Sequence, residues 1–365
     1  MKKKILIVFG TRPEAIKMCP LVHELKSRDR IETVICVTGQ HREMLDQVLN
    51  AFQVVPDFDF SIMKTKQTLF DVTLNILEKL QRILEEVKPD VVLVHGDTTT
   101  TFVTGLACFY SKIPIGHVEA GLRTYDIYSP FPEEFNRQAI GIIAKYHFTP
   151  TEQTKANLIK EGKNPNSIYV TGNTAIDALK MTVKDPYYHE QLDWAADSKL
   201  VLLTAHRREN LGEPIRNIFR ALKRIVDEYP DIKVVYPIHL NPEIRSNAQG
   251  ILGNCNRVRI IEPLGVLDFH NFLSRSYLIL TDSGGIQEEA PSLGKPVLVM
   301  RNTTERPEGV AAGTLKLVGI KEDGIYEAIR KLLCDKGEYE KMSQARNPYG
   351  DGFASKKIAD ILEEN

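Results

Sequence analysis

The chain has 365 residues, with 47 lysines and arginines against 48 aspartates and glutamates, so its formal net charge is −1 when histidine is neutral. A chain of this length usually divides into domains of roughly 100–200 residues, which predicts two domains. The balanced charge argues against nucleic acid or an anionic membrane as the main partner, but it leaves room for a small anionic ligand in a local basic pocket.

The five cysteines are scattered and form no C-x-x-C motif, which favours reduced thiols over a disulfide framework or a zinc site. The N-terminal apolar run Ile5–Phe9 is shorter than the roughly 7–15 residues of a signal-peptide core. No stretch approaches the roughly 18 apolar residues of a membrane span. We therefore expect a soluble, cytoplasmic protein.

Short, continuously apolar runs alternate with amphipathic segments along the chain. Such runs are typical of strands buried on both faces of a parallel sheet. The predicted strands are Ile5–Phe9, Thr33–Thr38, Val91–His95, Ile115–Val118, Lys199–Thr204, Lys233–Ile238, Val258–Ile261, Leu278–Thr281 and Val297–Met300. The predicted helices include Leu69–Val87, Pro214–Glu228, Glu322–Leu333 and Ala354–Glu364. This alternation predicts an α/β fold with two Rossmann-like, doubly wound domains facing across a cleft.

We place the domain boundary in the stretch that precedes the strand beginning at Lys199. The predicted N-terminal domain spans residues 1–172, and the C-terminal domain spans residues 173–352. The terminal helix, within residues 353–365, follows the glycine-rich turn Tyr349–Gly352 and could pack back on the N-terminal domain.

Open parallel sheets bind ligands beyond the carboxyl ends of their strands, so the loops there are informative. After the first strand, Arg12 and Lys17 lie near a helix start, where anions are favoured. Alternatively, Arg12 and Lys17 are two solvated cations on the protein surface without a binding role. Asp97 follows the strand that ends at His95, and it is either a carboxylate aimed into the cleft or part of a helix N-cap.

Two further acidic positions follow the strand Ile115–Val118. Glu119 comes directly after this apolar strand, where an unpaired carboxylate would be costly. Glu133 and Glu134 follow a Pro-Phe-Pro segment. They either act in the cleft or occupy a helix N-terminus, where acidic residues are favoured in any case.

In the second half, the strand Lys199–Thr204 leads into His206, Arg207 and Arg208. This cluster indicates an anion site with a titratable neighbour, although His206 alone could be a structural hydrogen-bonding group. The histidines match no H-E-x-x-H or similar template, so we expect no metal site.

The most informative feature is the junction after Leu278–Thr281, where Ser283-Gly284-Gly285 precedes a predicted helix. Glycines let backbone N–H groups approach a phosphate, and a helix N-terminus adds positive potential. Glu289 in that helix could reach a ribose hydroxyl, and the loop from Arg301 to Arg306 adds a second cation. Together with the carboxylates of the first half, this pattern suggests nucleotide-sugar chemistry.

Five segments carry a family resemblance: Phe9–Lys17 (FGTRPEAIK), His95–Thr101 (HGDTTTT), Gly116–Thr124 (GHVEAGLRT), His206–Asn210 (HRREN) and Thr281–Val297 (TDSGGIQEEAPSLGKPV). Together they resemble the bacterial non-hydrolysing UDP-N-acetylglucosamine 2-epimerases over nearly the whole chain. The resemblance implies a fold of the glycosyltransferase-B type, a homodimer, and interconversion of UDP-N-acetylglucosamine and UDP-N-acetylmannosamine. It also implies a supply of N-acetylmannosamine for cell-surface polysaccharide.

The same resemblance implies roles for individual residues. The residues that match family positions at the reacting sugar and phosphates are Arg12, Lys17, Asp97, Glu119, Glu133 and His206. The residues that match the family's UDP-binding positions are Ser283, Gly284, Gly285, Glu289 and Arg306, and Phe269 matches an aromatic residue near the uracil. A second UDP-N-acetylglucosamine is implied as an activator, at positions matching Gln40, Glu43, Lys66, Glu133, Arg207 and His239. Some relatives have Gln at the place of Glu43 and Arg at the place of Lys66, and we expect weaker activation here because Lys cannot form the bidentate contact of Arg.

No carbonyl acidifies the C2–H bond of the intact sugar ring, so the expected route first cleaves the C1–O bond to UDP. Loss of the C2 proton then gives 2-acetamidoglucal, and UDP re-adds after reprotonation on the other face. Asp97, Glu119 and Glu133 are the candidate acid, base and charge-stabilising groups, with their individual roles open. This route needs no metal or nicotinamide cofactor. The rival functions are a hydrolysing epimerase, a UDP-sugar glycosyltransferase and a non-enzymatic nucleotide-sugar sensor.

Overall fold

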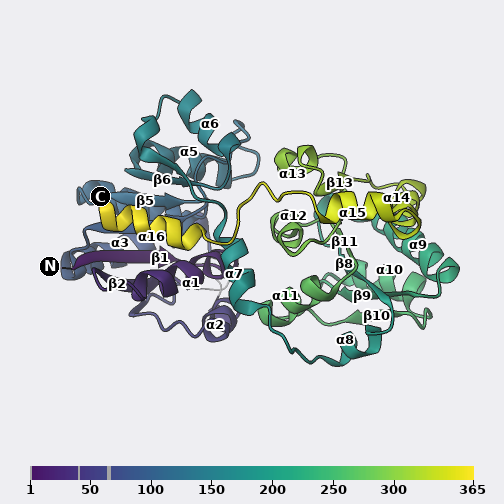
Figure 1. Cartoon of the computed structure of the whole chain (residues 1–365). Coiled ribbons are helices and arrows are strands. Elements are labelled where there is room, and N and C mark those ends of the chain that lie inside the picture. Colours follow the sequence, from purple (N-terminus) through teal and green to yellow (C-terminus); the bar gives the residue numbers. More distant parts are fainter. Residues whose placement is uncertain (1, 40–41, 64–66) are drawn as a thin grey trace. The chain divides into compact units, whose positions relative to one another are not determined.

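The computed structural model describes residues 2–39, 42–63 and 67–365. The chain forms two compact units (Figure 1). The first unit comprises residues 1–181 and 349–365, and the second unit comprises residues 182–348. Each unit is built around one parallel sheet.

The first unit contains a seven-stranded sheet in the order β3-β2-β1-β4-β5-β6-β7. Its strands are β1 (Lys3–Phe9), β2 (Ile31–Val37), β3 (Phe58–Asp59), β4 (Val91–His95), β5 (Ile115–Val118), β6 (Tyr146–Thr149) and β7 (Ile168–Val170). All neighbouring strands pair in parallel. The strand order reverses between β1 and β4, and this switch point is where a doubly wound sheet binds its ligand.

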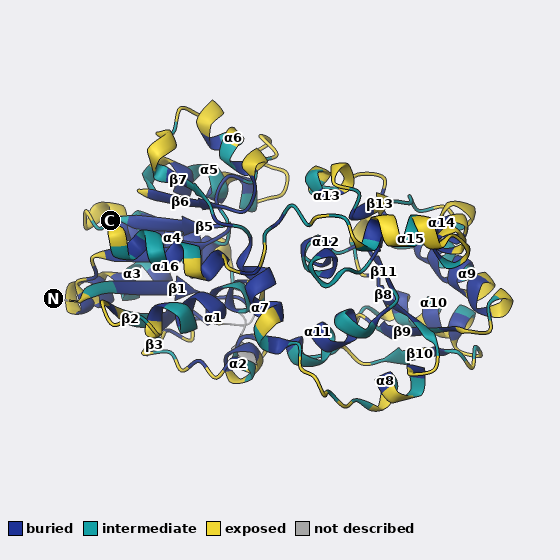
Figure 2. Cartoon of the chain, in the orientation of Figure 1, coloured by how far each residue is buried: buried dark blue, intermediate teal, exposed yellow. Residues whose placement is uncertain are grey.

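The helices of the first unit connect these strands. They are α1 (Arg12–Lys26), α2 (Arg42–Ala51), α3 (Leu69–Val87), α4 (Thr99–Tyr110), α5 (Glu133–Ile143), α6 (Glu152–Lys160), α7 (Thr174–Thr182) and the C-terminal α16 (Ala354–Glu364), with a 3-10 turn, η1, at Pro165–Ser167. Strands β1 and β4 carry almost wholly buried side chains because helices cover the sheet (Figure 2).

The second unit repeats this topology with six strands in the order β10-β9-β8-β11-β12-β13, all parallel. The strands are β8 (Lys199–Thr204), β9 (Ile232–Pro237), β10 (Val258–Ile261), β11 (Leu278–Thr281), β12 (Val297–Val299) and β13 (Leu315–Leu317). The helices are α8 (Glu190–Ala195), α9 (Glu213–Glu228), α10 (Pro242–Leu252), α11 (Val266–Arg275), α12 (Ile286–Glu289), α13 (Pro307–Ala311), α14 (Glu322–Cys334) and α15 (Lys336–Ser343), with 3-10 turns η2 (Arg208–Asn210) and η3 (Ala290–Leu293). The switch point here lies between β8 and β11.

The chain divides after residues 181 and 348, rather than after the predicted 172 and 352. The difference at residue 172 arises because α7 is hydrogen-bonded within the first unit. Asp177 accepts bonds from the backbone N–H groups of Ala354 and Ser355 at 3.2 and 2.7 Å. Helix α16 belongs to the first unit, where Arg28, just beyond the C-terminus of α1, forms ion pairs with Asp360 and Glu363 at 2.8 and 2.9 Å. Over the part of the chain that the structure describes, no helix is both long enough and apolar enough to cross a membrane.

Candidate functional site

The carboxylate of Glu119 lies at the carboxyl end of β5, next to the switch point of the first unit. It forms an ion pair with Lys17 of α1, and Asn173 donates a hydrogen bond of 3.0 Å from Nδ2 to the same Glu119 oxygen, Oε2. His95 Nε2, at the end of β4, lies 3.7 Å from that oxygen. Three segments far apart in the sequence thus converge on one carboxylate, and Lys17 and Glu119 are in direct contact.

This environment sets the ionisation of Glu119. Burial by itself raises the pKa of the carboxyl group, but the charges of Lys17 and His95 outweigh burial and hold the pKa well below its usual range. Glu119 is therefore ionised at neutral pH, and its backbone has a positive φ of 63°. Such a conformation is strained in a residue other than glycine, and strain of this kind is concentrated at functional sites.

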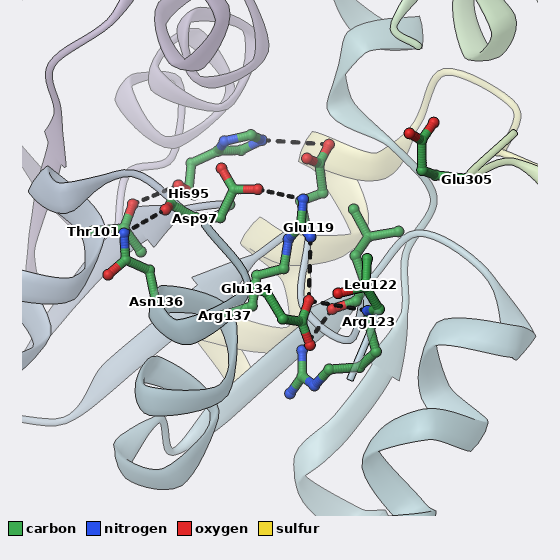
Figure 3. A network of polar contacts seen from close by, with 12 residues as sticks. His95, Asp97, Thr101, Glu119, Leu122, Arg123, Glu134, Asn136, Arg137 and Glu305 are labelled. Atoms are coloured by element: carbon green, nitrogen blue, oxygen red, sulfur yellow. Dashed lines mark hydrogen bonds and ion pairs between the residues drawn. The ribbon is translucent and has the colours of Figure 1, made fainter. Parts of the chain in front are cut away.

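Asp97 lies just beyond β4 and forms a 2.6 Å ion pair with Nη2 of Arg137 on α5 (Figure 3). Its backbone carbonyl accepts a 2.8 Å hydrogen bond from Asn136. The N-cap of α4 is Thr98, whose side chain accepts a bond from the N–H of Thr101. Helix capping therefore does not account for the Asp97 side chain, whose partner is Arg137.

The two acidic residues that begin α5 have different environments. Glu134 is fully buried, and its carboxylate accepts bonds from the backbone N–H groups of Thr124 and Tyr125 at 3.0 and 3.1 Å. It also contacts Arg137 at 3.3 Å. Glu133, in contrast, has a buried Oε2 with no hydrogen-bond partner among the described residues. Glu134 is thus a structural anchor, whereas Glu133 Oε2 makes no hydrogen bond to the described part of the chain.

The sequence did not single out Glu14, which organises the switch point. Its Oε2 accepts bonds from the backbone N–H groups of Gly10 and Thr11 at 3.0 and 2.8 Å. Its Oε1 accepts bonds from the hydroxyls of Thr98 and Thr101 at 2.7 and 3.4 Å. Burial raises the pKa of this carboxyl group. Glu14 therefore joins the loop after β1 to the loop after β4.

A second buried acid plays the same part in the second unit. Asp282 follows β11, and its Oδ2 accepts bonds of 2.9 Å from the backbone N–H groups of His206 and Arg207 and from Nδ2 of Asn210. Its other oxygen, Oδ1, lies 3.4 Å from His206 Nδ1. Burial lowers the pKa of His206, the charge of Asp282 opposes this, and His239 and Arg207 lower it further. Asp282 thus fixes the backbone of the loop after β8.

The glycine turn after β11 is lined by two cations. A Cβ placed on Gly284 would lie 3.6 Å from Nη2 of Arg207 and 3.9 Å from Nη2 of Arg306. A Cβ on Gly285 would lie 3.8 Å from Oε1 of Glu289. The predicted helix after this turn, α12, spans only Ile286–Glu289. The turn is therefore flanked by two guanidinium groups rather than followed by a long helix. Arg306 forms an ion pair with Glu288, and Arg207 lies 3.6 Å from Glu305.

The remaining predicted site residues lie in several different parts of the two units. Arg12, the first residue of α1, is half-buried. Phe269 packs against the core of the second unit. The ring of His239 stacks on His206 with 5.9 Å between centroids. Gln40 and Lys66 lie outside the described residues, as does the side chain of Glu43.

Comparison with known proteins agrees with this arrangement. The family described as UDP-N-acetylglucosamine 2-epimerase matches residues 23–363. The chain is 62% identical over 363 residues to the UDP-N-acetylglucosamine 2-epimerase of Bacillus subtilis (strain 168), covering 99% of this chain and 96% of that protein.

Two solved structures extend the comparison. The UDP-GlcNAc 2-epimerase of Neisseria meningitidis bound to UDP-GlcNAc has a TM-score of 0.90 and 51% identity, over 99% of this chain and 100% of that one. The enzyme of Methanocaldococcus jannaschii in complex with UDP-GlcNAc and UDP has a TM-score of 0.80 and 34% identity, with the same coverage. The predicted fold of two Rossmann-like domains of the glycosyltransferase-B type is confirmed by such neighbours. The chain belongs to the UDP-N-acetylglucosamine 2-epimerase family, whose members are isomerases.

Proposed function

We propose that this protein interconverts UDP-N-acetylglucosamine and UDP-N-acetylmannosamine without hydrolysis, through elimination and re-addition of UDP. The observation that carries the proposal is the cationic glycine turn of the second unit, where Arg207 and Arg306 flank Gly284. Backbone at glycine can approach a diphosphate closely, and guanidinium groups bind phosphate oxygens in bidentate fashion. We assign the UDP moiety to this turn, with Ser283 and Gly285 on either side of Gly284.

The second unit offers further groups to the nucleotide. Glu289 Oε1 lies close to Gly285, where a carboxylate can accept hydrogen bonds from ribose hydroxyls. Phe269 is the candidate neighbour of the uracil ring. His206 stands at the end of β8 with Nδ1 near the Asp282 carboxylate, so Nε2 is the nitrogen available to a phosphate oxygen.

In the proposed reaction, the C1–O bond breaks first and its electron pair leaves with UDP. Positive charge then develops on C1 and the ring oxygen. The C2–H bond breaks next: its proton passes to a carboxylate, and its electrons form the C1=C2 double bond of 2-acetamidoglucal. Reprotonation of C2 on the opposite face, with attack of the UDP oxygen on C1, gives the manno epimer. Atoms and electrons balance, and no metal or nicotinamide is consumed.

The first unit supplies the three carboxylates that this chemistry needs. Glu119 is ionised and suits the stabilisation of positive charge at C1 or the removal of a proton. Glu133 has an oxygen with no partner among the described residues, and Asp97 is oriented by Arg137. Arg12 and Lys17 add positive charge for the departing phosphate. A positioned acid or base contributes about 10²–10⁴-fold in rate.

Incubation of the purified protein with UDP-N-acetylglucosamine alone tests the proposal. Proton and phosphorus NMR should show UDP-N-acetylmannosamine accumulating to a constant ratio, without an acceptor, added metal or nicotinamide. Stoichiometric free UDP with N-acetylmannosamine would instead establish a hydrolysing epimerase. An absolute requirement for a sugar acceptor would establish a glycosyltransferase, and binding without turnover would establish a sensor.

We also propose that a second UDP-N-acetylglucosamine acts as an activator, at a site that includes Arg207, His239, Gln40, Glu43 and Lys66. Arg207 lies near Gly284, so an activator that contacts Arg207 could influence the UDP turn. Such coupling between sites must be reciprocal for binding. The reverse reaction from pure UDP-N-acetylmannosamine should show a lag that a trace of the gluco epimer removes. A reverse reaction that starts at full rate without the gluco epimer would exclude an obligatory activator.

We further propose a homodimer that uses helices α3 and α4. Both helices expose large apolar side chains: Phe70 and Leu74 are 81% and 65% exposed, and Phe109 and Tyr110 are 59% and 69% exposed. Helices α3 and α4 pack against each other, and exposed apolar side chains of this size are typical of protein–protein contacts. Light scattering should give twice the mass of one chain, and Phe70→Lys should shift the protein to monomers. A monomeric wild-type protein at micromolar concentration would contradict this assembly.

We propose a cytoplasmic location and a role in supplying N-acetylmannosamine for cell-surface polysaccharide. The five cysteines are all free, which fits a reducing compartment. Deletion of the gene should remove UDP-N-acetylmannosamine from cell extracts, and an unchanged level would contradict this role.

A further inference from the structure

Asn173 immediately precedes α7 and is almost fully buried in the first unit. Each of its polar groups has a separate partner. The side-chain Nδ2 donates to Glu119 Oε2 at 3.0 Å, and the side-chain Oδ1 accepts from the backbone N–H of Ala175 at 2.9 Å. The backbone N–H donates to the carbonyl of Tyr349 at 2.7 Å. The amide is therefore held in one orientation, with its donor directed at the carboxylate.

The carbonyl that holds Asn173 belongs to the segment Tyr349–Gly352, where the chain returns from the second unit to the first. This return segment packs directly on the backbone before α7. A Cβ on Gly172 would lie 3.2 Å from Cα of Gly350, and a Cβ on Gly350 would lie 3.1 Å from Cα of Gly172. Both glycines also have positive φ angles, of 92° and 125°. A side chain at either position would push the two segments apart.

We propose that Asn173 is a positioning residue for the catalytic carboxylate of Glu119, and that the return segment Tyr349–Gly352 holds Asn173 in place. This inference rests on the proposed function, in which Glu119 acts on the sugar. It gives the return segment a role in catalysis besides joining the two units. Neither Asn173 nor the return segment needs to touch the substrate for this role.

Asn173 and Lys17 bind the same Glu119 oxygen, Oε2. Within the part of the chain that the structure describes, Lys17 from α1 and His95 from the end of β4 are the charged and titratable groups that form ion pairs with Glu119. Lys17 is a flexible cation that attracts the carboxylate without fixing its plane. The Asn173 amide adds a directional bond from a backbone-anchored donor, which limits rotation of the carboxylate. A displacement of about 1 Å in a catalytic group can cost roughly 10²-fold in rate.

Asn173→Asp is the most informative variant because aspartate has nearly the shape of asparagine but turns the attractive contact with Glu119 into a repulsive one. The new carboxylate can still accept the bond from Ala175, so α7 keeps its cap. The donor to Glu119 is replaced by a charged oxygen, and both the loss of this hydrogen bond and the new negative charge raise the pKa of Glu119. We expect kcat to fall by about 10²-fold, with a smaller change in KM, and the acidic limb of the kcat/KM profile to move to higher pH. Asn164→Asp is the matched control, since Asn164 caps an exposed turn in the same unit. This variant should leave kcat and the pH profile of kcat/KM unchanged.

Asn173→Ser provides a second variant in case the charged one fails to fold. A serine hydroxyl can still accept from the N–H of Ala175, but it is too short to reach Glu119. We expect kcat to fall by about tenfold with the melting temperature preserved. In a Glu119→Gln background, Asn173→Asp should cause little further loss, because two residues that act through one contact are not additive.

The return segment is tested by Gly350→Ala, which should lower kcat and shift the acidic limb in the same direction as Asn173→Asp. Gly162→Ala is its matched control. Gly162 also has a positive φ, of 78°, but a Cβ there meets no atom within 4 Å. It therefore introduces backbone strain without moving the Asn173 contact, and activity should be retained.

A direct readout separates this inference from the proposed function. Carbon-13 NMR of labelled glutamate carboxyl groups, assigned with Glu119→Gln, should show the Glu119 titration moving to higher pH in Asn173→Asp, whether or not the protein turns over substrate. A folded Asn173→Asp protein with an unchanged Glu119 titration would overturn the inference, as would wild-type kcat in both Asn173 variants. A wild-type protein that does not epimerise UDP-N-acetylglucosamine would overturn the proposed function instead.

Discussion

The replacement Asp282→Asn should reveal how far one buried carboxylate determines the UDP site. Asp282 is fully buried, and three hydrogen-bond donors converge on its Oδ2. Two of these donors are the backbone N–H groups of His206 and Arg207, whose side chains we assign to phosphate binding. Asparagine can present one oxygen to the same three donors, but it replaces Oδ1 with an NH₂ group that faces His206 Nδ1.

The expected loss in the free energy of unfolding follows from the three hydrogen bonds to Asp282. A bond to a charged group contributes about 1.5–3 kcal/mol and a neutral bond about 0.5–1.5 kcal/mol, so neutralising the acceptor should cost about 1 kcal/mol per bond and about 3 kcal/mol in all. At roughly 2–4 °C per kcal/mol for a domain of this size, the melting temperature of the second unit should fall by roughly 6–12 °C. The charge of Asp282 opposes the lowering of the His206 pKa, so its removal should lower that pKa further.

Calorimetry and the pH dependence of kcat/KM measure these two effects. If the protonated imidazole assists departure of UDP, the limb on which activity falls with rising pH should move to lower pH in Asp282→Asn. Asp197→Asn is the matched control, because Asp197 is an exposed partner of Lys233 with a side chain 80% exposed. A folded Asp282→Asn protein with wild-type melting temperature and pH profile would refute the assignment of Asp282 as the anchor of this loop.

Three further predictions concern single groups. Asp97→Asn and Glu133→Gln should each lower kcat by at least about 10²-fold with little change in melting temperature, and wild-type turnover in either would remove that residue from the catalytic set. Gly284→Val should fold, because a Cβ there meets its nearest atom only at 3.6 Å, yet it should weaken UDP binding in calorimetry relative to Gly250→Val; equal affinities would contradict a diphosphate at this turn. Glu14→Gln removes a carboxyl whose pKa is raised by burial from 4.5, and such a group favours folding only when protonated. The free energy of unfolding of this variant relative to wild type should therefore decrease as pH falls from neutral towards 4.5, and a constant difference would contradict the raised pKa.

The strands of both sheets were largely predictable because they are continuously apolar. Val91–His95, Ile115–Val118 and Leu278–Thr281 were predicted with the bounds that the structure shows. Strand β6, Tyr146–Thr149, was missed because His147 and Thr149 interrupt its apolar pattern, although both are buried. The two-residue β3 is too short to give a pattern.

The site was predictable only where the key residues follow a strand in the sequence. Lys17 and Glu119 were singled out by their places after β1 and β5, but their contact joins residues 102 positions apart. The anchoring roles of Glu14 and Asp282 depend on loops that are distant in the sequence, and one sequence carries no signal for such pairs. Each residue does lie at a strand–helix turn beside predicted site residues, and this position alone could have identified Glu14 and Asp282 as candidate site residues.

The length of α12 and the domain boundary required three-dimensional information. Pro291 and Gly294 lie close after the glycine turn, so the chain passes from one α-helical turn into η3 rather than continuing a helix. The boundary is displaced from the predicted position because residues 349–365 return to the first unit and bind α7. The return of a C-terminal segment to the first domain involves contacts that local patterns do not contain.

The central claim is that epimerisation proceeds by removal of the C2 proton with UDP as the leaving group. Its most direct test is to run the reaction in heavy water and examine both epimers by proton NMR and mass spectrometry. The proposed route predicts UDP-N-acetylmannosamine with one solvent deuterium at C2, because the carboxylate that removes the proton exchanges with solvent, and it predicts no net release of UDP. A manno epimer that retains its original C2 hydrogen would contradict proton removal and the elimination route built on it.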